Sequence, residues 1–275
     1  MIADGHLHVW ADHDEAYPWQ PIHGVTPPAI EGSVEFVLAV LDEHEVDAAI
    51  AVQSRAYGDD HSYLADARRR FPDRIVAVAA LDPRDPRVSL SLADLVADGF
   101  AGLRLDPLGW GAGPLVDGSV LPLWDAAVDL GLPIEVMIAP SQLTALRPLV
   151  DRTPETPVVI EHAARYLARP DDAVDAVCEL AAAPNVFVKV SALASISGEA
   201  PPHRDLWPFL KTLCDRFGPE RLLWGSDMPW IGAAGYGPEL ATISELPWLD
   251  DAGRAALLGG TAGRVFGLPV EAGRG

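Results

Sequence analysis

Short apolar segments alternate with amphipathic segments along almost the whole chain. Between the apolar segments, apolar side chains recur at helical spacing over residues 34–44, 62–71, 90–97, 121–130, 142–150, 173–182 and 206–217, with further helical turns after Trp230. Eight apolar segments have the length of buried strands, and they cover residues 2–9, 47–53, 75–81, 101–106, 133–138, 158–162, 186–190 and 222–225. Eight strand–helix units in about 250 residues are typical of the (β/α)₈ barrel. We therefore predict an α/β fold, a single-domain (β/α)₈ TIM barrel.

Proline and glycine support these boundaries, because they stop predicted helices just before the next strand at residues 71–74, 131–133, 184–185 and 217–220. A doubly wound open sheet is the alternative fold. It is disfavoured because no glycine-rich phosphate loop follows the first strand. We expect the domain to span residues 1–270 and residues 271–275 to form a loose tail. The proline-containing stretch 11–31 is expected to cover part of the barrel mouth.

Charge and hydropathy exclude several classes of function. The 275 residues are 49% apolar, which is enough for a large core, and 40 acidic against 20 basic residues give a net charge of −20. This charge disfavours nucleic acids and anionic membranes as partners. No apolar run reaches membrane-spanning length and no signal peptide is visible, so we expect a cytoplasmic protein. Cys178 and Cys214 lie in predicted helices and are expected to be buried without a chemical role.

The first predicted strand carries two histidines two residues apart. Because successive side chains of a strand point to opposite faces, His6 and His8 share one face. Active sites of (β/α)₈ barrels lie at the carboxyl ends of the strands, and the first and last strands are neighbours. Asp227, which follows the eighth strand, should therefore lie beside His6 and His8. Polar residues also end the other strands: Gln53 and Arg55, Asp82, Arg104 and Asp106, Glu135, His162, and Ser191.

These features resemble the amidohydrolase superfamily and, within it, the amidohydrolase-2 branch of sugar-acid lactonases and pyrone-dicarboxylate lactonases. The resemblance rests on the His-x-His of the first strand, on Glu161-His162 and on the segment 223–230 that contains Asp227. Weaker matches extend it over nearly the whole chain, at Trp10 and at residues 17–19, 102–104, 185–191 and 257–267. It implies a hydrolase in which Asp227 activates water and the histidines bind a metal or the substrate carbonyl.

The resemblance also bears on the metal. Two-metal members use a carboxylated lysine on strand four and a histidine on strand five. This chain has only two lysines, Lys189 and Lys211, and no histidine between His61 and His162, so a two-metal site is disfavoured. One zinc or manganese ion is one alternative, with a ligand set of His6, His8, His162 and Asp227, and Glu135 as a further candidate. Catalysis without a metal is the other.

Four further residues are predicted to bind substrate. Arg104 would bind a substrate carboxylate, unless it pairs with Asp82 or Asp106. Arg55 follows the second strand and could face the substrate. Lys189 shares a strand face with Ser191 and is expected to point inward, and Trp230 would wall the pocket. The remaining histidines are expected in loops or at the surface, with His23 the first candidate for an exception: His13, His23, His44 and His203.

We predict an enzyme that opens a small-molecule lactone, with Asp227, His6, His8 and His162 as the catalytic residues. The alternatives are a metal-dependent decarboxylase of the same branch and a catalytically silent binding protein. The expected partner is a small-molecule substrate, with no nucleic acid and no membrane, and the oligomeric state stays open.

Overall fold

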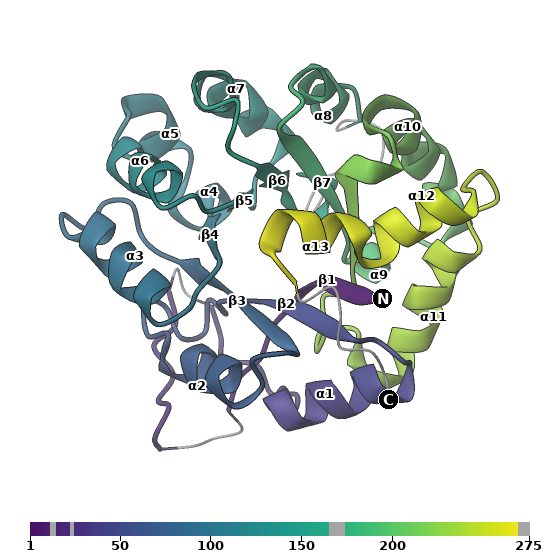
Figure 1. Cartoon of the computed structure of the whole chain (residues 1–275), viewed down its shortest axis with the longest axis horizontal. Helices are drawn as coiled ribbons and strands as arrows, with labels where there is room; N and C mark the ends of the chain where they lie inside the picture. Colours follow the sequence, from purple (N-terminus) through teal and green to yellow (C-terminus); the bar gives the residue numbers. More distant parts are fainter. Residues whose placement is uncertain (12–14, 23–24, 165–173, 269–275) are drawn as a thin grey trace.

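Eight parallel strands follow one another in sequence order around the centre of the molecule (Figure 1). The computed structural model describes residues 1–11, 15–22, 25–164 and 174–268. The strands are β1 (Ala3–Leu7), β2 (Ala48–Val52), β3 (Ile75–Ala80), β4 (Gly102–Leu105), β5 (Ile134–Val136), β6 (Val158–Ile160), β7 (Val186–Ser191) and β8 (Leu222–Gly225). Seven of the predicted strand segments contain one strand each, and β7 extends one residue beyond the predicted segment 186–190. The predicted (β/α)₈ barrel is confirmed.

Helices surround the strands (Figure 1). They are α1 (Val34–Glu43), α2 (Ser62–Arg70), α3 (Val88–Ala97), α4 (Pro107–Trp110), α5 (Gly113–Asp117), α6 (Leu121–Asp129), α7 (Leu143–Arg152), α8 (Val174–Glu179), α9 (Leu193–Ile196), α10 (Trp207–Phe217), α11 (Gly232–Ser244), α12 (Asp251–Ala255) and α13 (Thr261–Phe266). The short helices α4, α5 and α9 were not predicted, because four or five residues show no helical periodicity. Among the described residues, no helix has the length and apolar content needed to cross a membrane. The predicted tail, residues 271–275, lies outside the described residues.

The first and last strands close the barrel through main-chain contacts just beyond β8. The His8 N–H donates to the carbonyl of Met228 at 2.8 Å, and the Asp227 N–H donates to the carbonyl of His6 at 2.9 Å. The backbones approach so closely that a Cβ on Gly225 would lie 2.6 Å from the His6 nitrogen, and one on Gly5 would lie 2.5 Å from the Trp224 carbonyl oxygen. Glycine at these two positions therefore allows the closure that brings Asp227 beside the histidines.

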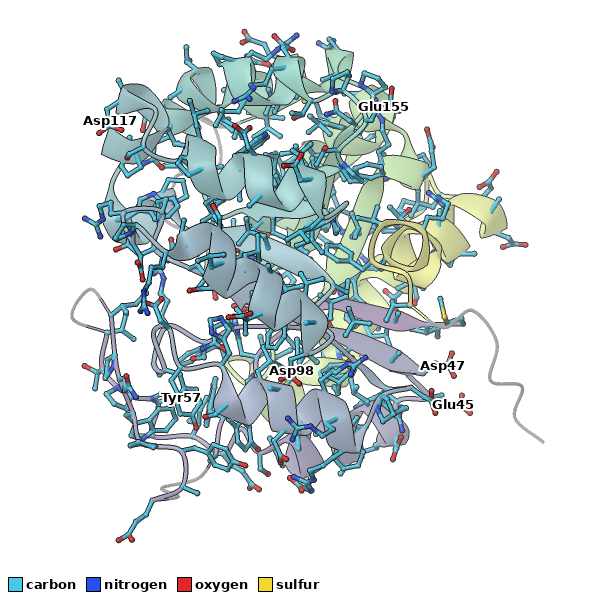
Figure 2. All side chains as sticks on the ribbon, turned by 60° about the vertical axis from the view of Figure 1, so that its left-hand side comes forward. Glu45, Asp47, Tyr57, Asp98, Asp117 and Glu155 are labelled. Atoms are coloured by element: carbon cyan, nitrogen blue, oxygen red, sulfur yellow. The ribbon has the colours of Figure 1, made fainter. Side chains whose placement is uncertain are left out.

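The inside of the barrel is apolar towards the start of the strands and polar towards their ends. Helix α13 crosses the centre of the barrel in Figure 1, and its Phe266 packs with the inward-facing residues Ala3, Ala48, Ile50, Val76, Val78, Val159 and Leu223. Figure 2 shows the two ends of β2: Glu45 and Asp47 precede it on one side of the molecule, and Tyr57 follows it on the other. The polar side chains described next lie towards the ends of the strands.

Candidate active site

His6, His8 and Asp227 meet where β1 ends and the segment after β8 begins. Asp227 Oδ1 lies 3.7 Å from His6 Nε2 and 3.6 Å from His8 Nε2, and all three side chains are buried. The two imidazole rings are 5.1 Å apart and perpendicular. The structure thus brings together three residues that lie far apart in the sequence, since Asp227 follows His8 by 219 positions.

His162 joins this group from the end of β6. Its ring centre lies 4.7 Å from that of His6, and its Nδ1 lies 2.9 Å from the hydroxyl of Ser191 on β7. His162 and Asp227 both have left-handed backbones, with φ of 50° and 64°, and Ala192 after β7 has φ of 55°. Such conformations cost about 1–3 kcal/mol each for residues other than glycine, and they cluster at functional sites. Here they turn the chain sharply at the ends of three neighbouring strands.

Burial favours the neutral form of His6 and His162. It lowers the pKa of His6 well below its ordinary value, with the charge of Lys189 as the next cause, and it also lowers the pKa of His162. His8 Nδ1 lies 2.8 Å from the carbonyl oxygen of Val52. Since a carbonyl only accepts, His8 carries a proton on Nδ1, and its Nε2 faces Asp227.

A cavity of about 170 Å³ opens above these groups. Its wall combines the polar residues of the site with apolar side chains, two of them from the segment 11–31: His8, Val25, Pro28, Ser54, Arg55, Ala56, Arg104, Met137, His162, Asp227 and Trp230. Trp230 is 49% exposed and packs against Trp10 at 5.2 Å between ring centres. A larger groove of about 530 Å³ lies beside α2 and α3 and shares no residue with this wall, and six of its fourteen lining residues are aspartates.

The two arginines of the wall are each paired with an acidic residue of the protein. Arg55 forms a two-pronged ion pair with Asp106. Arg104 donates from Nε and Nη2 to Glu161 at 3.1 and 2.8 Å. Although burial opposes it, the Arg104 guanidinium holds the pKa of Glu161 at about 2. From the sequence we considered Asp82 and Asp106 as ion-pair partners for Arg104. In the structure the partner of Arg104 is Glu161, and Asp82 pairs with Arg84 near the surface.

Lys189 points inward but does not line the cavity. It is fully buried, its Nζ lies 3.1 Å from His6 Nδ1, and it forms an ion pair with Glu135 on β5. Burial acts to raise the pKa of Glu135, and the ammonium group of Lys189 opposes this shift. Lys189 therefore supports His6 from below, and the structure provides no direct path from it to a molecule in the cavity.

The remaining histidines differ in their outcome. His203, expected in a loop or at the surface, lies in a loop but is buried, and its Nε2 lies 2.7 Å from Glu239 of α11. Its burial was not predicted, because nothing in the local sequence marks a partner 36 residues away. His44 is half-buried and stacks on Tyr236. His13 and His23 lie outside the described residues. Cys178 and Cys214 are free thiols, and Cys178 is buried.

The arrangement contains a candidate metal site. Ligand atoms of His6, His162 and Asp227 lie within 4.8 Å of one another, and within the described part of the chain His6 Nε2 has no hydrogen-bond partner. His8 has the carbonyl contact at Nδ1 that is typical of a metal-ligating histidine. His6 does not, because its Nδ1 faces the ammonium of Lys189, which is a donor. The full set of four predicted ligands therefore does not fit a metal as the side chains stand.

Comparison with known proteins agrees with this geometry. The family model described as Amidohydrolase matches residues 3–268. The chain belongs to the amidohydrolase family. An L-fucono-1,5-lactonase of Burkholderia ambifaria is 31% identical, with 98% of this chain and 97% of that protein aligned. A 4-sulfomuconolactone hydrolase of Rhizobium radiobacter is 28% identical over 83% of this chain and 76% of that protein.

A solved structure adds an observation about metals in this family. An amidohydrolase from Burkholderia multivorans with bound zinc is 27% identical and has a TM-score of 0.78, covering 98% of this chain and all of that chain. The resemblance inferred from the His-x-His, Glu161-His162 and the segment around Asp227 is thereby confirmed. Sequence reasoning missed the pairs of Lys189 with His6 and of Arg104 with Glu161. The signal that could have indicated these pairs is that Lys189 and Arg104 are charged residues in apolar strands and face inward.

Proposed function

We propose that this protein hydrolyses a small, uncharged lactone with Asp227 as the base that activates water. The observation that carries this proposal is the position of the Asp227 carboxylate, which faces the cavity between the Nε2 atoms of His6 and His8. Two relatives that are named for the hydrolysis of a lactone support it. We also propose His6, His8 and His162 as catalytic residues.

The chemistry follows from the order of these groups. Asp227 takes a proton from a water molecule while the water oxygen attacks the lactone carbonyl carbon. The carbonyl oxygen becomes an oxyanion, and an imidazole N–H from the His6–His8 pair donates a hydrogen bond to it. When the ring C–O bond breaks, Asp227 returns its proton to the departing oxygen. The product is the open hydroxy acid, and Asp227 is ionised again.

The charges around the cavity favour a substrate without ionised groups. Among the described residues, three cations lie near the site, and each has a carboxylate partner: Arg55 with Asp106, Arg104 with Glu161, and Lys189 with Glu135. Asp227 adds a further negative charge. A substrate carboxylate would therefore have to displace one of these partners, which leaves a charge unpaired. Arg55, Arg104 and Trp230 would instead donate to, and pack against, the hydroxyl-bearing ring of a neutral lactone.

A zinc or manganese ion held by the predicted ligands would add polarisation of the same carbonyl, and no step above depends on it. The test is a lactone panel followed by proton release, with and without a chelator. We expect turnover of uncharged sugar lactones such as L-fucono-1,5-lactone, at rates well above those for carboxylated lactones and 4-sulfomuconolactone, and none with Asp227→Asn. If no lactone is opened while an aromatic acid releases CO₂, the reaction class is a decarboxylation and the proposal fails.

A further inference from the structure

We propose that Lys189 is a positioning residue that fixes the proton of His6 on Nε2, which makes His6 a hydrogen-bond donor to the substrate rather than a metal ligand. The inference deepens the proposed function, since it assigns the imidazole N–H that holds the lactone oxygen. It rests on the contacts of Lys189 with His6 and Glu135 beneath the cavity. Neither membership of the family nor similarity to the named relatives gives these contacts a role.

The contact between Lys189 and His6 has only one consistent direction. An ammonium group carries three donors and no acceptor, so Lys189 donates to His6 Nδ1 at 3.1 Å. Lys189 also forms an ion pair with Glu135, and the side chains of Lys189, Glu135 and His6 are fully buried. A neutral imidazole that accepts at Nδ1 carries its proton at Nε2. In His6 this is the atom that faces Asp227, and it has no hydrogen-bond partner among the residues that the structure describes.

His8 has the opposite arrangement. Its Nδ1 donates to the Val52 carbonyl, so in the neutral ring Nε2 carries the lone pair. The two histidines of the His-x-His motif therefore offer different groups to the same carboxylate: an N–H from His6 and a lone pair from His8. The N–H suits the oxyanion, whereas the lone pair and Asp227 together accept the two protons of the attacking water. One water and one carbonyl are thus bound in distinct orientations.

The same contact works against metal binding through His6. A metal takes the lone pair of the ligating nitrogen, and the other ring nitrogen then needs an acceptor. Lys189 offers a donor there, so a metal at His6 Nε2 would require the lysine to turn away or lose its proton. Removing Lys189 should therefore make His6 a better metal ligand and a poorer hydrogen-bond donor.

The test reads the His6 tautomer directly by ¹⁵N NMR of the imidazole nitrogens, with His6→Gln to assign its signals. In the unaltered protein we expect a protonated Nε2 on His6 and a protonated Nδ1 on His8. The test variant is Lys189→Met combined with Glu135→Met, because a single Lys189→Met would leave the Glu135 carboxyl buried without its cation. Lys211→Met, which removes the other lysine, at the surface, is the matched control.

In the double variant we expect His6 to lose its fixed Nε2 proton, and zinc to bind about tenfold more tightly by calorimetry, the usual size of an effect on a ligand's hydrogen-bond partner. We also expect kcat for the lactone to fall about 100-fold at constant KM, as for the loss of one oxyanion donor. A proton on Nδ1 of His6 in the unaltered protein, or equal zinc affinity in both proteins, would overturn the proposal. The NMR and zinc readouts need no turnover, so they stand apart from the lactonase test.

Discussion

At the scale of the residue, Asp227 is the group whose proposed role can be tested most directly. Asp227→Asn keeps the size of the side chain and a residue type that tolerates a left-handed backbone, here with φ of 64°. The amide cannot take a proton from water, so kcat should fall about 10³-fold, within the range for loss of a general base. Steady-state kinetics on the best lactone of the panel, with circular dichroism as a check of folding, measures this.

A matched control is Asp82→Asn, which alters a carboxylate at the end of β3 that pairs with Arg84 instead of facing the cavity. This variant should retain the activity of the unaltered protein. If Asp227→Asn kept its activity as well, Asp227 would not be the base, whatever the position of its carboxylate.

The positions of some site residues could be predicted from the sequence, but the contacts between others could not. His6, His8 and Asp227 could be predicted because the fold fixes where strand ends meet, and a barrel joins its first strand to its last. The contact between Lys189 and His6 could not, because it depends on how deep in the barrel each side chain lies, and strand periodicity indicates only the face. The same limit applies to Arg104, whose partner Glu161 is one residue before the histidine that drew attention.

At the scale of the element, the seam between β1 and β8 is the feature that assembles the site. Gly225→Ala would place a Cβ 2.6 Å from the His6 nitrogen, closer than real contacts allow. Because backbone lies on the other side, the strands must separate, and we expect a loss of several kcal/mol in the free energy of unfolding together with a loss of activity. Urea unfolding followed by tryptophan fluorescence measures the first effect.

Gly113→Ala is the control for that experiment, since nothing lies within 4 Å of a Cβ at this position, in the first turn of α5. It should leave stability and activity almost unchanged. A Gly225→Ala protein as stable and active as the control would show that the seam tolerates a wider separation than the contacts indicate.

His61 ties the start of α2 to β3 and provides a test of pH dependence. Its Nδ1 donates to the Asp59 carbonyl at 2.9 Å and its Nε2 accepts from the Ala80 N–H at 3.2 Å, so the folded protein requires the neutral ring. Burial lowers its pKa to about 4. Between pH 6.5 and 4 the unfolded chain therefore binds a proton that the folded protein does not, and His61 makes stability fall as the pH falls.

We expect His61→Gln to lower the free energy of unfolding at pH 7 by about 1–2 kcal/mol, from the altered hydrogen bonds. At pH 4.5 the loss should be smaller, since the variant has no such proton to bind. Urea unfolding of both proteins at the two pH values tests this. A loss of equal size at both would mean that the ring does not titrate in this window.

The elements themselves were largely predictable, because eight buried parallel strands read as apolar runs and most helices carry one apolar face. Helices α4 and α5 follow β4 in a stretch rich in glycine and proline, which indicates a loop. They form there because Asp106 caps Gly109 and proline occupies the first turn of each.

At the scale of the whole molecule, the net charge of −20 should favour uncharged over anionic substrates, as the cavity does. Anionic substrates are repelled at long range, and salt screens this repulsion. We expect kcat/KM for a carboxylated lactone to rise several-fold between low salt and about 0.5 M salt, while the value for an uncharged lactone changes little. Rates measured over a salt series check this. A falling value for the carboxylated lactone would indicate an attractive cationic site instead.

The main-chain contacts between His6 and Asp227 also have a consequence for synthesis of the protein. A growing polypeptide on the ribosome presents both imidazoles about two hundred residues before the carboxylate that completes the site. Every product that ends before Asp227 therefore lacks the reactive group. Such fragments should be inert towards metabolites.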